Sequence, residues 1–195
     1  MSVYDFQWVT SDNFDVKKLS IDQDFIAKTK RKKILYKYNS KEEPKELRLT
    51  VPRIERAYVQ VNQLKQDSYE GKQTKKYTTS MILDTENKHH VALYDSIVDI
   101  VNGATEILEL ETNMAHKDRD KRIEIYCGVV QTGEGEVHTK FYDSEQILDI
   151  LEYGAFIGRP ALCFSVNTDN GKIQCQIYQA FASKQIKNFP LSIRD

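Results

Sequence analysis

A basic segment with interleaved tyrosines has the residue types and spacing best suited to bind a ligand. Between Phe25 and Lys41 the chain carries seven cations, two tyrosines and no carboxylate. Positive charge attracts phosphate, and a flat ring beside it gives a nucleobase a surface on which to stack. The segment therefore predicts contacts to a flexible nucleic acid strand from Lys32, Lys33, Tyr36 and Tyr38.

The same combination of ring and cation recurs on later segments that read as strands. In three of them the two residues are an even number apart: Arg56 with Tyr58, Arg122 with Tyr126, and Lys140 with Tyr142. Such residues project to the same side of a strand, so one polar face would present all three pairs. A single tyrosine is common at a half-buried sheet position, and the prediction depends on the repetition. Four further expected contacts are Arg53, Lys75, Lys76 and Tyr77.

No segment has the spacing of a catalytic or metal-binding motif. The four histidines and three cysteines form no C-x-x-C or H-x-x-x-H pair, and G-x-S-x-G is absent. Gly133 and Gly135 read as a hairpin turn because no helix pattern follows them. We expect no enzymatic activity, no cofactor and no metal.

Cysteine usage favours an intracellular, reducing compartment. Cys127, Cys163 and Cys175 are odd in number, lie in strand-like apolar runs and follow no recognisable secretory signal. We expect buried free thiols. Cys163 and Cys175 flank the turn of the last hairpin, which leaves open that they are neighbours across it. The apolar runs are too short to cross a bilayer, so no membrane association is expected.

Charge is segregated along the chain and small overall. The formal net charge of the 195 residues is −1. Residues 95–111 carry carboxylates and no cation, in contrast to the basic segment. Any attraction to phosphate must therefore come from one face of the molecule, although two solvated faces of an ordinary domain would give the same pattern.

Hydrophobic periodicity predicts a mainly β fold with α-helix. Alternation predicts strands at 46–51, 57–61, 77–83, 123–129, 137–142, 161–166 and 172–181, the last two joined by an Asn-Gly turn. An apolar stripe predicts one principal helix from His89 to about Leu110, and capping residues predict short helices at 25–33 and from Ser144.

Antiparallel pairs with one inserted helix indicate an OB-like small antiparallel barrel of the α+β class, with a short second helix near Ser144. The expected organisation is an aromatic and basic extension (1–44) packing on the barrel, the barrel domain (45–183) and a C-terminal tail (184–195).

Two segments resemble a known family. The strand at 75–84 (KKYTTSMILD) precedes the long helix, and 154–166 (GAFIGRPALCFSV) opens the final hairpin, which returns through 173–181. This order is similar to that of the OB-fold single-stranded DNA-binding proteins of tailed phages and large DNA viruses, over about residues 45–183. The resemblance implies a non-catalytic protein that coats single-stranded DNA during replication or recombination, with DNA favoured over RNA. That family usually ends in an acidic tail, whereas residues 184–195 are mildly basic.

An alternative function remains open at this point. The N-terminus carries Tyr4, Phe6 and Trp8, and aromatic residues are enriched in protein interfaces. A structural or interaction protein, such as a virion or assembly component, would use such a surface. A homo-oligomer is compatible with either function.

Overall fold

The computed structural model describes residues 7–24, 30–64, 76–131, 137–143, 146–148 and 154–185. Its β-strands are β1 (Val9–Thr10), β2 (Leu19–Ile21), β3 (Arg31–Tyr36), β4 (Lys45–Glu46), β5 (Leu49–Thr50), β6 (Ala57–Leu64), β7 (Lys76–Asp84), β8 (Asn113–Met114), β9 (His116–Arg119), β10 (Arg122–Val129), β11 (Lys140–Asp143), β12 (Gln146–Leu148), β13 (Ala155–Asn167) and β14 (Lys172–Gln185). Its helices are α1 (Lys88–Leu108) and the short 3-10 helices η1 (Ser11–Asn13) and η2 (Val16–Lys18).

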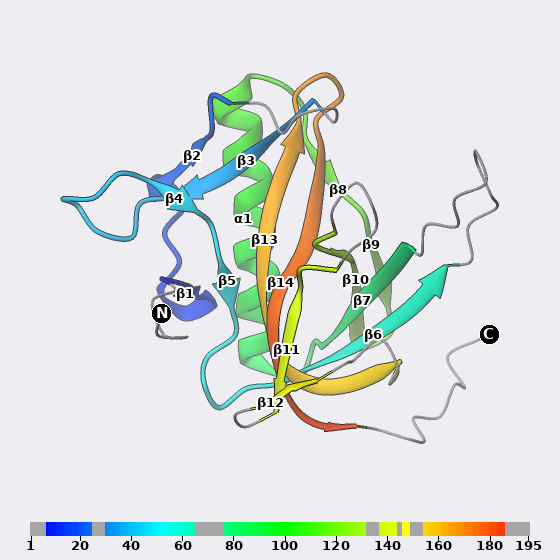
Figure 1. The fold of residues 1–195 in the computed structure, drawn as a ribbon. Helices are drawn as coiled ribbons and strands as arrows, with labels where there is room; N and C mark the ends of the chain where they lie inside the picture. Colours follow the sequence, from blue (N-terminus) through cyan, green and yellow to red (C-terminus); the bar gives the residue numbers. More distant parts are fainter. Residues whose placement is uncertain are drawn as a thin grey trace.

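Five of these strands close into a barrel (Figure 1). The pairing order is β13–β6–β7–β10–β14, and β14 pairs back onto β13. All of these pairs are antiparallel except β10 with β14. Alternate residues point inward, among them Val59, Met81, Ile125 and Ile177, each less than 1% exposed. The fold is therefore the expected OB-like barrel of the α+β class.

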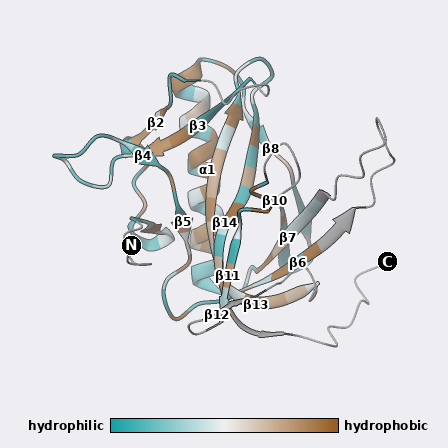
Figure 2. Ribbon diagram, viewed as in Figure 1, coloured by the Kyte–Doolittle hydropathy of each residue, from teal (hydrophilic) through white to brown (hydrophobic). Residues whose placement is uncertain are grey.

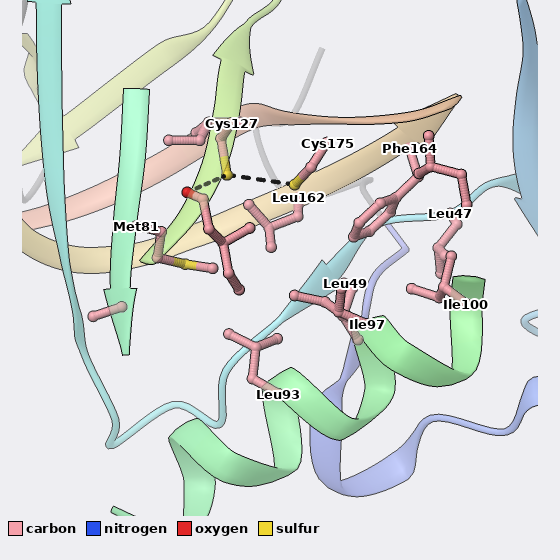
Figure 3. Close-up of a cluster of buried hydrophobic side chains, with 14 of the residues drawn as sticks. Leu47, Leu49, Met81, Leu93, Ile97, Ile100, Cys127, Leu162, Phe164 and Cys175 are labelled. Atoms are coloured by element: carbon pink, nitrogen blue, oxygen red, sulfur yellow. Dashed lines mark hydrogen bonds between the residues drawn. The ribbon is translucent and has the colours of Figure 1, made fainter. Parts of the chain in front are cut away.

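Helix α1 packs its apolar stripe on the core (Figure 3). Asn87 caps its first turn, its side chain accepting from the backbone N–H groups of His89 and His90. Leu93, Ile97 and Ile100 are at most 1% exposed. Figure 2 shows hydrophobic and hydrophilic segments alternating along the helix, as an amphipathic helix requires. The predicted principal helix is confirmed, and it ends at Leu108.

The N-terminal segment joins the same core. β3 pairs with the far part of β13, so that Lys33 lies opposite Ser165. η1, η2 and β2 pack against α1, where Gly103 lets the side chains of Val16 and Leu19 approach the helix. Val9, Ile21 and Ile34 are buried together with the barrel residues.

The predicted helix at 25–33 is wrong over Arg31–Lys33, which begin β3, while 25–29 lie outside the described residues. The Asp22 side chain accepts from the N–H of Asp24, a local turn that imitates a helix cap in the sequence. The alternating burial of Ile34 and Tyr36 then fits a strand.

Residues 137–148 also differ from the expectation. β11 pairs in parallel with β14 and antiparallel with β12, and one isolated bridge joins Gln131 to Val137. Hence only the start of 137–142 returns beside the end of β10, where His138 donates its N–H to the carbonyl oxygen of Val130, and Lys140–Asp143 pairs with β14 and β12 instead. Gln146–Leu148 is a strand where a short helix was predicted. No second α-helix occurs in the part of the chain that the structure describes. A short apolar run is compatible with either a helix or a strand, and here pairing with a neighbouring strand determines the strand conformation.

The last hairpin is confirmed and is longer than predicted. β13 and β14 flank a turn in which Gly171 has a φ of +66° and donates its N–H to the carbonyl oxygen of Asn167. The predicted strand at 46–51 is divided into β4 and β5, but its alternation was informative, since Leu47, Leu49 and Val51 are all buried.

Candidate nucleic-acid interface

The predicted contacts on and near β3 have structural roles. Tyr36 is 2% exposed, and its ring stacks on Phe14 and meets Tyr38 edge to face. The Tyr38 hydroxyl donates to the carbonyl oxygen of Glu46 (3.1 Å), and burial raises the pKa of Tyr38 to about 12. Tyr36 therefore exposes almost no ring surface, whereas Tyr38 is half-buried.

The lysines of β3 also have interaction partners within the protein, and Lys33 lies far along β13 from Arg159. Lys33 forms an ion pair with Glu46 (3.4 Å), and half-buried Lys32 has partners of its own. Lys33 lies opposite Ser165, six residues along β13 from Arg159, which corresponds to about 20 Å. The basic segment is therefore separate from the cluster described below.

Two of the three predicted contacts around the start of β7 lie among the described residues. Tyr77 is half-buried and packs against the core. Lys76 begins β7, and Lys75 lies outside the described residues.

Tyr58 and Tyr126 share the outer side of the barrel. Tyr58 on β6 lies opposite Ile82 of β7, which in turn lies opposite Glu124 of β10. Tyr126 is two residues beyond Glu124 and is 46% exposed. The alternation predicted for these strands thus places both rings on one face, with β7 between them. Arg122, at the start of β10, lies opposite Asp84.

Four residues form a compact group on the outer side of β13 and β14, which we call the arginine–aromatic cluster: Trp8, Tyr142, Arg159 and Phe181. Tyr142 stacks on Phe181, with ring centroids 5.6 Å apart and planes inclined by 30°. Trp8 meets the same ring edge to face at 6.1 Å. The guanidinium carbon of Arg159 lies 5.9 Å from the centroid of Phe181. Exposed Lys140 precedes Tyr142 on the same side of β11.

The cluster continues onto β6 through the strand register. Ile157 lies opposite Tyr58, and Gly158 lies opposite Ala57. Arg159 therefore comes beside Arg56, the residue preceding β6. Gly158 is required here because a Cβ at this position would collide with the carbonyl group of Phe181.

Three arginines gather at this junction. Burial lowers the pKa of the Arg159 guanidinium, and the charges of Arg53 and Arg56 lower it further. Arg53 and Arg56 are exposed and Arg159 is half-buried. Within the described ranges, no carboxylate forms an ion pair with any of the three. Like charges held together in this way repel one another, and a bound anion would relieve the repulsion.

The nucleic-acid contacts predicted from the sequence do not include Trp8, Arg159 or Phe181, and Trp8 was expected only in a protein interface. Arg159 did carry a signal, because it is a lone cation within the apolar run of β13. Trp8 carried a signal only as one of the N-terminal aromatic residues, and Phe181 carried none, because their proximity depends on the pairing of β11 with β14 and on the position of the N-terminal segment.

The cysteines are buried free thiols, as predicted, and the alternative that Cys163 and Cys175 are neighbours across the last hairpin is excluded. Cys163 lies opposite Gln176, and Cys175 lies opposite Phe164, so the two thiols project to opposite faces. Cys175 instead lies opposite Cys127 of β10, with 3.4 Å between their sulfur atoms (Figure 3). Burial raises the pKa of Cys163 to about 12 and that of Cys175 well above its usual value.

The described residues show neither a metal-binding cluster nor a helix suited to a membrane. They contain no group of three or more histidine, cysteine or acidic side chains placed to hold a metal ion. None of their helices combines the length and apolar character that spanning a membrane requires.

Comparison with known proteins finds similarity in structure alone. No protein-family model matches the sequence, and no curated protein matches it either. Among solved structures, the single-stranded DNA-binding protein gp2.5 of bacteriophage T7 matches with a TM-score of 0.47 and 10% identity, over 75% of this chain and 96% of that one. The single-stranded DNA-binding protein of bacteriophage Enc34 matches with a TM-score of 0.49 and 15% identity, over 90% of this chain and 96% of that one. The Enc34 protein in complex with single-stranded DNA matches with a TM-score of 0.45 and 12% identity, over 89% of this chain and 99% of that one.

Each match reflects a similar backbone fold at low sequence identity. The matched proteins are of the class that the sequence at 45–183 resembles.

Proposed function

We propose that the protein is a non-catalytic single-stranded DNA-binding protein. Its role would be to coat or protect exposed strands during replication or recombination of a viral or phage genome, the setting that the sequence resemblance implies. The binding surface would run from the arginine–aromatic cluster, over Arg53 and Arg56, to Tyr58 and onward to Tyr126.

The observation that supports this function best is the gathering of Arg53, Arg56 and Arg159 beside the stacked rings of Tyr142 and Phe181. Three cations with no carboxylate partner among the described residues are suited to a phosphate backbone. The neighbouring rings supply faces and edges for bases.

Single strands fit this surface better than duplex. In a duplex the flat faces of the bases are already stacked, whereas an unpaired base has a free face. Trp8 is 40% exposed and Tyr126 is 46% exposed, so both rings have surface available for stacking. The acidic residues of α1, such as Asp95, Asp99 and Glu106, are exposed on the helix surface, where they would repel a phosphate backbone.

The direct test is fluorescence anisotropy of a labelled oligo-dT titrated with the protein at several salt concentrations. Binding at low salt that weakens steeply as salt rises is expected, because cations are released from the DNA. Absence of binding at micromolar protein in low salt would refute the proposal. The same titration with oligo-U and with duplex tests the preference for single-stranded DNA.

The position of the surface is tested by Arg159→Gln. Loss of one phosphate contact should weaken binding at all sequences and reduce the salt slope by about 1. Lys30→Gln is the control, since Lys30 pairs with Asp169 (2.8 Å) near the turn that joins β13 to β14. Equal binding by both variants and the parent would place the interface elsewhere.

Trp8 offers an independent readout, because it is the sole tryptophan of the sequence. Its emission should change during the titration if DNA contacts the arginine–aromatic cluster. Binding without any change in emission would argue against involvement of Trp8.

A second candidate function is supported by the exposed position of Trp8. An aromatic side chain on the surface beside an arginine also suits a protein–protein interface. A stable oligomer in light scattering that is indifferent to oligonucleotide would favour a structural or assembly role.

A further inference from the structure

The turn at 52–55, which leads into β6, presents an apolar side chain to solvent. Ile54 is 79% exposed, the largest exposed fraction among the exposed large hydrophobic side chains of the described residues. The N–H of Glu55 donates to the carbonyl oxygen of Pro52 (3.0 Å) and closes the turn. Arg53 precedes Ile54, and Arg56 follows two residues later, after Glu55, and both arginines are exposed.

This turn is fixed to the start of α1 by side-chain hydrogen bonds. Nδ2 of Asn87, the residue that caps the helix, donates to Oε2 of Glu55 (2.9 Å). His90 is 7% exposed, and its Nδ1 accepts from the N–H of Asp84 at the end of β7 (3.0 Å). Its Nε2 therefore carries the hydrogen and donates to the carbonyl oxygen of Arg56 (2.9 Å).

Such an arrangement costs little conformational entropy on binding, because the backbone of the turn is held before any ligand arrives. An exposed isoleucine alone is unremarkable on a protein surface. Here it stands on an anchored turn whose carboxylate, Glu55, is bonded to Asn87, and the nearby charges of Arg53 and Arg56 also act on Arg159. A ligand that carries regularly spaced negative charges with flat apolar groups between them would pair with the arginines and pack against Ile54 at the same time.

We propose that the turn at 52–55 is a preformed contact for a nucleobase, with Ile54 packing against the base while Arg53 and Arg56 neutralise the adjoining phosphates. Apolar side chains are used in this way between bases by other DNA-binding proteins. The inference rests on the proposed single-stranded DNA binding and adds to it a named apolar contact, together with its positioning by Asn87 and His90.

The test compares Ile54→Ala, Ile54→Phe and the parent in oligo-dT binding across a range of salt concentrations. Ile54→Ala should weaken binding about fivefold, since it removes three carbon atoms that would be partly buried against the base. Its salt slope should equal that of the parent because no phosphate contact is lost. Ile54→Phe should bind at least as tightly as the parent, because a ring stacks on a base.

Ile107→Ala is the matched control, since Ile107 is 46% exposed on α1, away from the turn. A fully abasic strand of the same length provides a second control, on which Ile54→Ala and the parent should bind alike.

The outcomes separate this inference from the proposed function. If the parent binds oligo-dT and Ile54→Ala binds within twofold of it, the inference is wrong and the function stands. If Ile54→Ala and Ile54→Phe both bind weakly, Ile54 maintains the conformation of the turn and does not contact a base, which also overturns the inference. If the parent does not bind, the proposed function itself fails.

Discussion

At the scale of single residues, burial decides which tyrosines can stack on a base. Tyr36 and Tyr38 lie in the most basic segment of the sequence, yet the first is 2% exposed and the second bonds to the backbone of Glu46. Tyr126 is 46% exposed and is available. Local charge in the sequence therefore points to the residue types of the proposed interface, whereas solvent exposure in the structure selects among them.

Buried thiols give a residue-scale prediction for stability against pH. The pKa of Cys163 is raised from 9.0 to about 12 in the folded state. Between these values the unfolded chain loses the thiol proton and the folded chain keeps it, so the free energy of unfolding falls as pH rises above 9. At pH 10 the loss from this group is about 1.4 kcal/mol.

Urea denaturation at pH 8 and pH 10 measures this effect, with Cys163→Ala as the comparison. The substitution should reduce the loss between the two pH values by about 1.4 kcal/mol, because the titrating group is absent. An equal loss in parent and variant would show that the Cys163 thiol titrates normally.

At the scale of elements, close approaches of the backbone fix the strands that would carry the proposed interface. Gly158 lets β13 approach β14 closely where Arg159 meets Phe181. Gly171 turns the chain between the same two strands, and a Cβ there would collide with the carbonyl group of Glu111.

Gly171→Ala should therefore destabilise the protein by about 3 kcal/mol, since it adds a side chain at a φ of +66° and a steric collision. Gly128→Ala is the control, because a Cβ at Gly128 would come no closer than 3.4 Å to the Gln174 side chain. Chemical denaturation of both variants measures the difference. Similar stabilities would mean that the turn relaxes without cost.

At the scale of the whole molecule, the N-terminal segment and the barrel share one core. Val9, Ile21 and Ile34 are buried with Val59, Met81 and the other barrel residues. α1 lies between the two parts and contacts both. A single cooperative unfolding transition is expected for such an arrangement.

Trp8 and the secondary structure report on different parts of this core. In a urea titration, the midpoint from Trp8 fluorescence should coincide with the midpoint from far-ultraviolet circular dichroism, because Trp8 contacts Phe181 of β14. An earlier fluorescence transition would show that the N-terminal segment detaches independently of the barrel.

The sequence by itself determined the elements whose burial pattern is local. Strands β6, β7 and β10, helix α1 and the final hairpin each follow from periodicity or a turn signal within their own residues. The same alternation placed Tyr58 and Tyr126 on one side of the barrel. The ambiguous segments were those with short apolar runs, such as β3 and β12, which depend on a partner strand.

Tertiary structure alone decided which side chains meet across the chain. Trp8, Tyr142, Arg159 and Phe181 are far apart in sequence, and the parallel pairing of β11 with β14 together with the register of β13 brings them together. Register also separated Cys163 from Cys175 and joined Cys175 to Cys127. Periodicity specifies which face a residue occupies, but it contains no information about which distant strand lies beside that face.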